Sequence, residues 1–90
     1  MTVERTVEIC NRRGLHARAA AKLAAAAREF TARAEIRRDD ERAPADSIME
    51  LLMLAAGPGV SVTVAAQGED AEDAVETLSA IIECGFDEDE

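Results

Sequence analysis

Hydrophobic and polar residues alternate in four separate stretches of the chain. A period of two residues is typical of a strand with one buried and one solvated face. The alternation predicts strands over residues 2–10, 31–38, 41–45 and 60–66, with Asp39-Asp40 as the turn of a hairpin. Pro44 has no N–H group to donate, so the third strand is expected at a sheet edge.

Three other stretches place apolar residues at the helical spacing of three and four. Residues 17–30 are rich in alanine and contain no glycine, proline or β-branched residue. A second helix is predicted over residues 47–55, ending before Gly57-Pro58-Gly59, and a third over residues 70–84, with Gly85 as its stop signal. The apolar stripes expected to face the sheet are Ala20, Leu23, Ala24 and Ala27; Ile48, Leu51, Leu52 and Ala55; and Ala71, Ala74, Val75, Leu78, Ile81 and Ile82.

The element order β-α-β-β-α-β-α predicts an α+β fold. Each predicted strand has one apolar face, which suits a four-stranded antiparallel sheet with three helices on one side and solvent on the other. Ninety residues allow one domain over residues 1–90. The acidic residues 87–90 are expected to form a frayed tail.

The charge of the chain is strongly asymmetric. Residues 1–42 carry all 10 basic and 7 acidic side chains (+3), and residues 43–90 carry 12 acidic and no basic ones (−12), giving the net charge of −9. This balance argues against nucleic-acid binding. With no apolar stretch of about 20 residues and no secretory signal, we expect a cytoplasmic protein without membrane insertion. Cys10 and Cys84 are predicted to be free thiols, and nothing in the chain requires more than a monomer.

The only histidine, His16, lies where a glycine-containing loop becomes the first predicted helix. It has no cysteine or carboxylate neighbours at metal-ligand spacing, so no metal site or cofactor is expected. No serine stands beside it in a nucleophile-like context, so a hydrolase triad is unsupported. The unpaired N–H groups of Ala17 and Arg18 at the helix start favour binding of a phosphate.

These features are compatible with phosphoryl transfer. The positive field of the helix end disfavours a charged imidazolium, which leaves a ring nitrogen of His16 free to act as a nucleophile. The guanidinium of Arg18 can hold phosphoryl oxygens in a bidentate fork. From the residues alone, a simpler interpretation stays open, in which His16 is an ordinary helix cap and Arg18 a solvated side chain.

Two motifs favour phosphoryl transfer over an ordinary helix cap. The pattern Asn11-x-x-Gly14-Leu15-His16-Ala17-Arg18 resembles the active-site signature of HPr, the histidine-containing phosphocarrier family of the bacterial phosphotransferase system. Ser47-Ile48-Met49-x-Leu51-x-x-Leu54 resembles the regulatory serine segment of that family, and the strand ending at Ala66 with Gly68-Glu69-Asp70 resembles its last strand and helix start. The resemblance spans nearly the whole chain.

The resemblance implies an open-faced β-sandwich and a carrier intermediate rather than a stand-alone enzyme. His16 would accept a phosphoryl group on Nδ1 from phospho-enzyme I and donate it to an enzyme IIA-type protein, in sugar uptake or in regulation. Arg18 would stabilise the phosphoryl group. Ser47 would be phosphorylated by an HPr kinase/phosphorylase.

Two departures from the family pattern bear on these roles. Many members carry proline after the arginine, where this chain has Ala19, and the Gly-Leu-His-Ala-Arg-Ala form resembles the nitrogen-regulatory branch. Asp46 and Glu50 flank Ser47, so a phosphate there would lie near two negative charges. Ser47 and Glu50 also form a capping box, which by itself explains the serine.

The candidate partner surface consists of Leu15, Ala19, Lys22, Met49 and Met53. The two methionines lie off the apolar face of their helix and suit docking with several partners, with core filling as the alternative. Two other functions stay open at this stage. One is an acyl or peptidyl carrier modified at Ser47, since Asp46-Ser47-Ile48 is similar to the modified segment of such helical proteins. The other is a non-catalytic regulatory binding module.

Overall fold

A computed structural model describes residues 2–88 of the chain. The elements in chain order are β1 (Thr2–Glu8), α1 (Ala17–Ala27), β2 (Arg33–Arg38), β3 (Glu41–Pro44), α2 (Ile48–Met53), β4 (Ser61–Gln67) and α3 (Ala71–Glu83), followed by one turn of 3-10 helix at Gly85–Asp87. This is the predicted order, and each strand and helix overlaps its predicted range, although α1 ends at Ala27 and not at residue 30.

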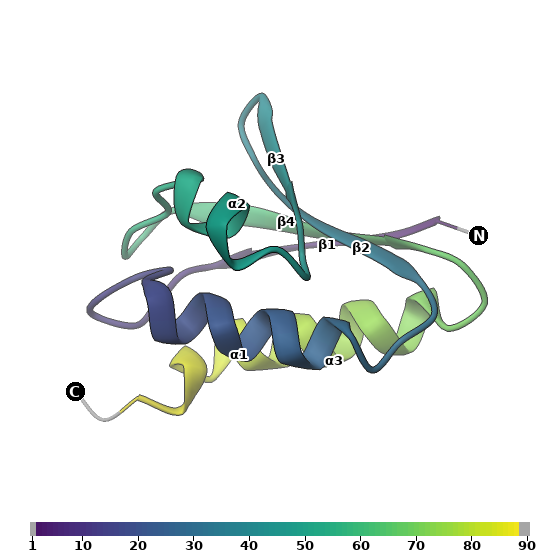
Figure 1. Ribbon diagram of the computed structural model, residues 1–90. Helices are drawn as coiled ribbons and strands as arrows, with labels where there is room; N and C mark the ends of the chain where they lie inside the picture. Colours follow the sequence, from purple (N-terminus) through teal and green to yellow (C-terminus); the bar gives the residue numbers. More distant parts are fainter. Residues whose placement is uncertain (1, 89–90) are drawn as a thin grey trace.

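The four strands form one antiparallel sheet in the order β1-β4-β2-β3. The register places Val7 opposite Val62 and Ile36 opposite both Val64 and Ala43, so their side chains share the buried face. Figure 1 shows α1 and α3 side by side along this face. Pro44 lies on the edge strand β3, as its missing N–H group requires. The predicted sheet and its covered face are confirmed.

The core is built from aliphatic side chains and many alanines. Ala20, Leu23 and Ala24 of α1 are completely buried, and Ala71, Ala74, Leu78 and Ile82 form the buried stripe of α3. Small side chains on α1 allow this helix to approach its neighbours closely. None of the helices within residues 2–88 is long and apolar enough to cross a bilayer.

Helix α2 is shorter than the apolar pattern predicts. It ends at Met53 with Leu54 as its C-cap, and Ala55 has a left-handed backbone (φ 52°). Of the predicted stripe only Leu51 is fully buried, while Ala55 is exposed. The cause is tertiary: Nη1 of Arg38 donates to the carbonyls of Leu54 (2.8 Å) and Ala55 (2.7 Å), which stabilises this early end of the helix.

The frayed tail predicted for residues 87–90 is wrong for its first two residues. Phe86 is completely buried in the core, and Asp87 is the last residue of the 3-10 turn. Glu88 forms hydrogen bonds with the side chains of Asn11 and His16. The apolar Phe86 anchors the segment, which the acidic composition of residues 87–90 does not reveal. Residues 89–90 lie outside the described residues. Cys10 and Cys84 are exposed free thiols.

Asp70 joins the start of α3 to the start of β2. Its carboxylate accepts hydrogen bonds from the N–H of Thr31 (2.9 Å), the hydroxyl of Thr31 (3.1 Å) and the N–H of Ala32 (2.7 Å). The bond from the N–H of Thr31 contributes most to lowering the pKa of Asp70 below its usual value. The sequence pattern places Asp70 in a helical first turn and does not indicate this contact.

The lowered pKa of Asp70 predicts an acid-dependent loss of stability. Its contribution is complete above the unfolded-state pKa, about 3.9, and is lost as the pH falls through the lower folded-state pKa. Asp70→Asn should therefore lower the melting temperature by several degrees at pH 7 and flatten its decline below about pH 4. Thermal melts followed by circular dichroism test this, with Glu72→Gln on the same helix as control. The prediction would be contradicted if the melting temperatures of wild type and Asp70→Asn fell equally as the pH was lowered below about 4.

Candidate active site

The loop before α1 is shaped by a close backbone contact at Gly14. Gly14 has φ 65°, and a Cβ at this position would lie 2.6 Å from the carbonyl oxygen of Ala56. The N–H of the next residue, Leu15, donates to that same carbonyl (2.8 Å), and the Leu15 side chain is buried. The loop is therefore fixed to the segment after α2, and this contact sets where His16 begins the helix.

His16 is the N-cap of α1, as the sequence predicts. Its backbone is extended (φ −86°, ψ −178°), its carbonyl accepts from the N–H of Ala20 (2.8 Å), and its Nδ1 accepts from the N–H of Arg18 (3.3 Å). The Nδ1 lone pair therefore points at the positive end of the helix. A phosphoryl group on Nδ1 would meet the same backbone N–H groups.

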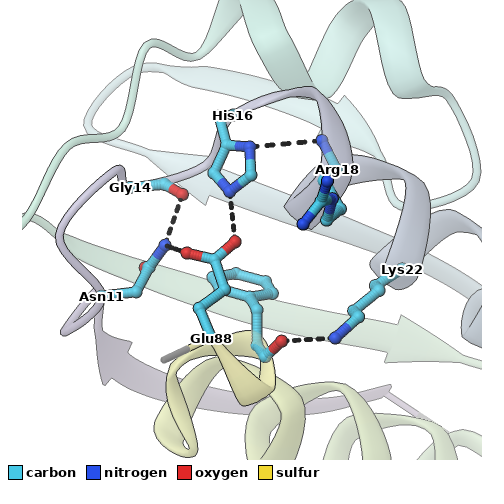
Figure 2. A network of polar contacts seen from close by, with 7 residues as sticks. Asn11, Gly14, His16, Arg18, Lys22 and Glu88 are labelled. Atoms are coloured by element: carbon cyan, nitrogen blue, oxygen red, sulfur yellow. Dashed lines mark hydrogen bonds and ion pairs between the residues drawn. The ribbon is translucent and has the colours of Figure 1, made fainter. Parts of the chain in front are cut away.

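The other ring nitrogen, Nε2, forms a hydrogen bond with the carboxylate of Glu88 (Figure 2). The second oxygen of Glu88 accepts from Nδ2 of Asn11 (2.9 Å), which also donates to the carbonyl of Gly14 (2.8 Å). The bond from Asn11, then that from His16, lowers the pKa of Glu88. The side chains of His16 and Glu88 are 16% and 14% exposed. Glu88 was not a candidate in the sequence, because 72 residues separate it from His16 and no motif marks it.

Two basic residues follow His16 on α1. Arg18 is exposed and lies beside the imidazole in Figure 2. Lys22, one turn further along α1, donates through Nζ to the carbonyl of Phe86. The structure thus brings Arg18 close to His16, whereas the ammonium of Lys22 is engaged by the C-terminal segment.

The candidate partner surface divides into two groups. Leu15 and Ala19 are buried, at 5% and 0% exposure, and belong to the hydrophobic core. The prediction that they offer a docking surface is wrong, because the loop contact at Gly14 and the packing of α1 turn both inward. Met49 and Met53 are 72% and 74% exposed, so the core-filling alternative does not hold for them. Their role in docking stays a prediction.

Ser47 is the N-cap of α2, and its Oγ accepts from the N–H of Glu50 (3.3 Å). The guanidinium of Arg28 donates to the neighbouring carbonyl of Asp46 (2.9 Å), so one basic side chain lies near the acidic flanks of Ser47. Within residues 2–88, no three His, Cys, Asp or Glu side chains are grouped closely enough to hold a metal ion.

Comparison with known proteins decides the family. Residues 3–84 match the family model described as the PTS HPr component phosphorylation site. The chain belongs to the HPr family of phosphotransferase-system phosphocarriers. It is 45% identical over 86 residues to the phosphocarrier protein NPr of Shewanella violacea, covering 96% of this chain and 94% of the relative. It is 42% identical over 90 residues to NPr of Escherichia coli, covering 99% and 100%.

Solved structures agree with this assignment. HPr-C-His from Thermoanaerobacter tengcongensis matches with a TM-score of 0.92 and 36% identity, covering 98% of this chain and 99% of that one. The HPr fold predicted from the resemblance is confirmed. Its four-stranded sheet excludes the acyl or peptidyl carrier alternative, which requires a helical bundle.

Proposed function

We propose that this HPr-family protein carries a phosphoryl group on Nδ1 of His16. The observation that supports the proposal most directly is the orientation of Nδ1, whose lone pair faces the N–H of Arg18 at the N-terminus of α1. In the transfer, that lone pair forms the new N–P bond as the bond between phosphorus and the donor atom of the phosphorylating protein breaks. The donor atom keeps the electron pair of the broken bond, and the N–H groups of Ala17 and Arg18 stabilise the phosphoryl oxygens.

The proposed donor is phospho-enzyme I and the proposed acceptor an enzyme IIA-type protein, in the cytoplasm. The presence of Ala19 after Arg18 favours the nitrogen-regulatory branch over sugar uptake. Ala19 is completely buried at the start of α1, where a small residue fits the packing. The protein is proposed to act as a monomeric carrier between these partners, without a cofactor.

Met49 and Met53 are proposed to form the docking surface for these partners. They lie one helical turn apart on α2 and are both largely exposed. Helix α2 packs against α1, so this apolar surface lies on the element next to the helix that His16 begins. Unbranched methionine side chains adapt to partners of different shape, which suits a carrier that must dock with both a donor and an acceptor.

Ser47 is proposed as a second, regulatory phosphorylation site for an HPr kinase/phosphorylase. A phosphate on Oγ would keep acceptor oxygens for the N–H of Glu50 at the start of α2. The side chain of Arg28, held at the carbonyl of Asp46, is the nearby positive charge that would offset repulsion by Asp46 and Glu50. The repulsion between a phosphate on Ser47 and the two carboxylates is therefore expected to be smaller than the sequence alone suggests.

The test of the proposed function is incubation with enzyme I and phosphoenolpyruvate. The protein should take up one phosphate that is stable to alkali and labile to acid, as expected of a phosphoramidate and not of a phosphoester. Peptide mapping should place the label on His16. A label that is acid-stable, or that requires ATP and maps to Ser47, would contradict His16 as the acceptor in this reaction.

Arg18 is expected to accelerate the transfer without supporting the fold. Its side chain is exposed, and it lies beside the imidazole. Arg18→Ala should slow phosphorylation by about a hundredfold, the loss expected when one donor to a developing anion is removed. Arg18→Lys should recover only part of the rate, because an ammonium lacks the bidentate fork. Single-turnover labelling measures both rates, with Arg33→Ala on β2 as control, and equal rates for Arg18→Ala and wild type would refute the role.

A further inference from the structure

The C-terminal segment approaches the imidazole ring from the side opposite to the helix end. Phe86 is buried in the core, and its carbonyl accepts from Nζ of Lys22, so the segment is attached to both the core and α1. From this anchor Glu88 reaches Nε2 of His16 (Figure 2). Phe86 and Asp87 both have left-handed backbones (φ 58°). Such a conformation is unfavourable for residues other than glycine, and here burial of Phe86 offsets the strain.

The two ring nitrogens of His16 have partners of opposite character. The ionised carboxylate of Glu88 only accepts hydrogen bonds, so Nε2 must carry the proton. The N–H of Arg18 only donates, so Nδ1 must present its lone pair. Both partners therefore require the same neutral tautomer, with hydrogen on Nε2.

We propose that Glu88 is a positioning residue that keeps Nε2 of His16 protonated and thereby presents Nδ1 as the phosphoryl-accepting atom. This inference rests on the proposed function, because it explains which nitrogen reacts. The logic is that of a catalytic triad, in which a carboxylate holds the imidazole in the reactive tautomer and stabilises the charged ring.

Asn11 orients the carboxylate for this task. Asn11 is 1% exposed, and its Nδ2 donates both to Glu88 (2.9 Å) and to the carbonyl of Gly14 (2.8 Å). With one oxygen of Glu88 held by Asn11, the other is left for Nε2. Hydrogen bonding by Asn11 and His16 also favours the ionised form of Glu88 by lowering its pKa.

The carboxylate would also act during the transfer. When the Nδ1 lone pair forms the bond to phosphorus, the ring gains positive charge, and the proton stays on Nε2. Glu88 lies directly at that proton and stabilises the charge. In the onward transfer, the N–P bond breaks and its electron pair returns to Nδ1. A ring that still carries hydrogen on Nε2 then leaves as neutral imidazole.

Glu88→Gln gives a sharp test because it changes hydrogen-bonding character and hardly changes shape. Nδ2 of Asn11 would hold the amide oxygen, which turns the amide NH₂ group toward Nε2. An NH₂ group can donate to Nε2 only if Nε2 has a lone pair, so hydrogen on Nε2 becomes unfavourable. The population with hydrogen on Nδ1 should therefore rise. Glu88→Ala removes the acceptor at Nε2 and should weaken the tautomer preference, which then depends on the N–H of Arg18 alone. Glu76→Gln, which removes an exposed carboxylate from α3, is the matched control.

The primary readout is the ¹⁵N NMR spectrum of the His16 ring in the unphosphorylated protein, at a pH where titration shows the ring to be neutral. Wild type and Glu76→Gln should show one nitrogen carrying hydrogen, Nε2, and one with a lone pair, Nδ1. Glu88→Gln should show a larger population with hydrogen on Nδ1, and Glu88→Ala a smaller shift in the same direction, because the N–H of Arg18 still faces Nδ1 in both variants. Single-turnover phosphorylation should slow by about tenfold in both Glu88 variants, as expected when the partner that orients a histidine is lost.

An unchanged ring spectrum in Glu88→Gln and Glu88→Ala would overturn the inference, as would an altered tautomer without a slower transfer. A slower transfer with an unchanged tautomer would also overturn it, because Glu88 would then act by another route. Failure of the proposed function would look different, since wild type itself would then take up no acid-labile phosphate.

Discussion

His16→Asn is expected to abolish phosphoenolpyruvate-dependent labelling while leaving the fold in place. Asparagine is among the best N-cap residues, and its side-chain oxygen can accept from the N–H of Arg18 as Nδ1 does. It has no nitrogen lone pair that can attack phosphorus. The variant therefore separates the capping role of His16 from its chemical role, which His16→Ala would remove together.

The measurement combines labelling with a thermal melt. Uptake of label should fall below detection, and the melting temperature should stay within a few degrees of wild type. Ser47→Ala provides the comparison at the other phosphorylation candidate, and it should take up label from enzyme I like wild type. Acid-labile labelling of His16→Asn at the wild-type level would disprove His16 as the acceptor.

Gly14→Ala is expected to have the largest effect on stability. The added Cβ would lie 2.6 Å from the carbonyl oxygen of Ala56 and 2.8 Å from Cα of Gly57, and the backbone would keep an unfavourable φ of 65°. Both contacts are with backbone atoms, which cannot move aside cheaply. We expect a loss of about 3 kcal/mol in the free energy of unfolding, from clash and backbone strain together. Urea denaturation followed by circular dichroism measures it.

Gly57→Ala is the matched control for this experiment. Gly57 lies on the opposing segment of the same contact, but a Cβ there would have no heavy atom within 4 Å, and its φ lies outside the left-handed region. Its stability should change by less than about 0.5 kcal/mol. If both variants lost the same free energy, the close approach of the Gly14 backbone would not be the cause. Gly14→Ala should also displace Leu15 and slow phosphorylation, because the bond from Leu15 to Ala56 places the start of α1.

Most of the fold could be predicted from local patterns. The alternation in Val60 to Ala66 and the helical stripe from Ala71 to Ile82 depend only on which faces must leave water, so each element was correctly typed without knowledge of its neighbours. The end of α2 could not be predicted in this way. Ala55 continues the apolar stripe, but Arg38, distant in the chain, stabilises the carbonyls at the earlier end.

The candidate site was found only in part. His16 and Arg18 were visible because the helix start, the glycine loop and the family pattern all lie within one short segment. The burial of Leu15 and Ala19 is not predictable in this way, because it depends on contacts with distant segments. The loop contact with Ala56 turns Leu15 inward, and the packing of α1 against its neighbours buries Ala19. Adjacency to His16 in sequence is therefore no guide to exposure.

Local patterns in the sequence are enough to predict the order of elements, the apolar faces and the position of His16 at a helix N-terminus, because these follow from interactions between residues close in the chain. The partners of the imidazole, in contrast, depend on how distant segments pack. Glu88 reaches Nε2 because Phe86 is buried in the core and its carbonyl is bonded to Lys22 of α1, which places the next residues near the ring. Contacts of this kind depend on how distant segments pack, and the acidic residues at the chain end carry no local signal that one of them lies against the histidine.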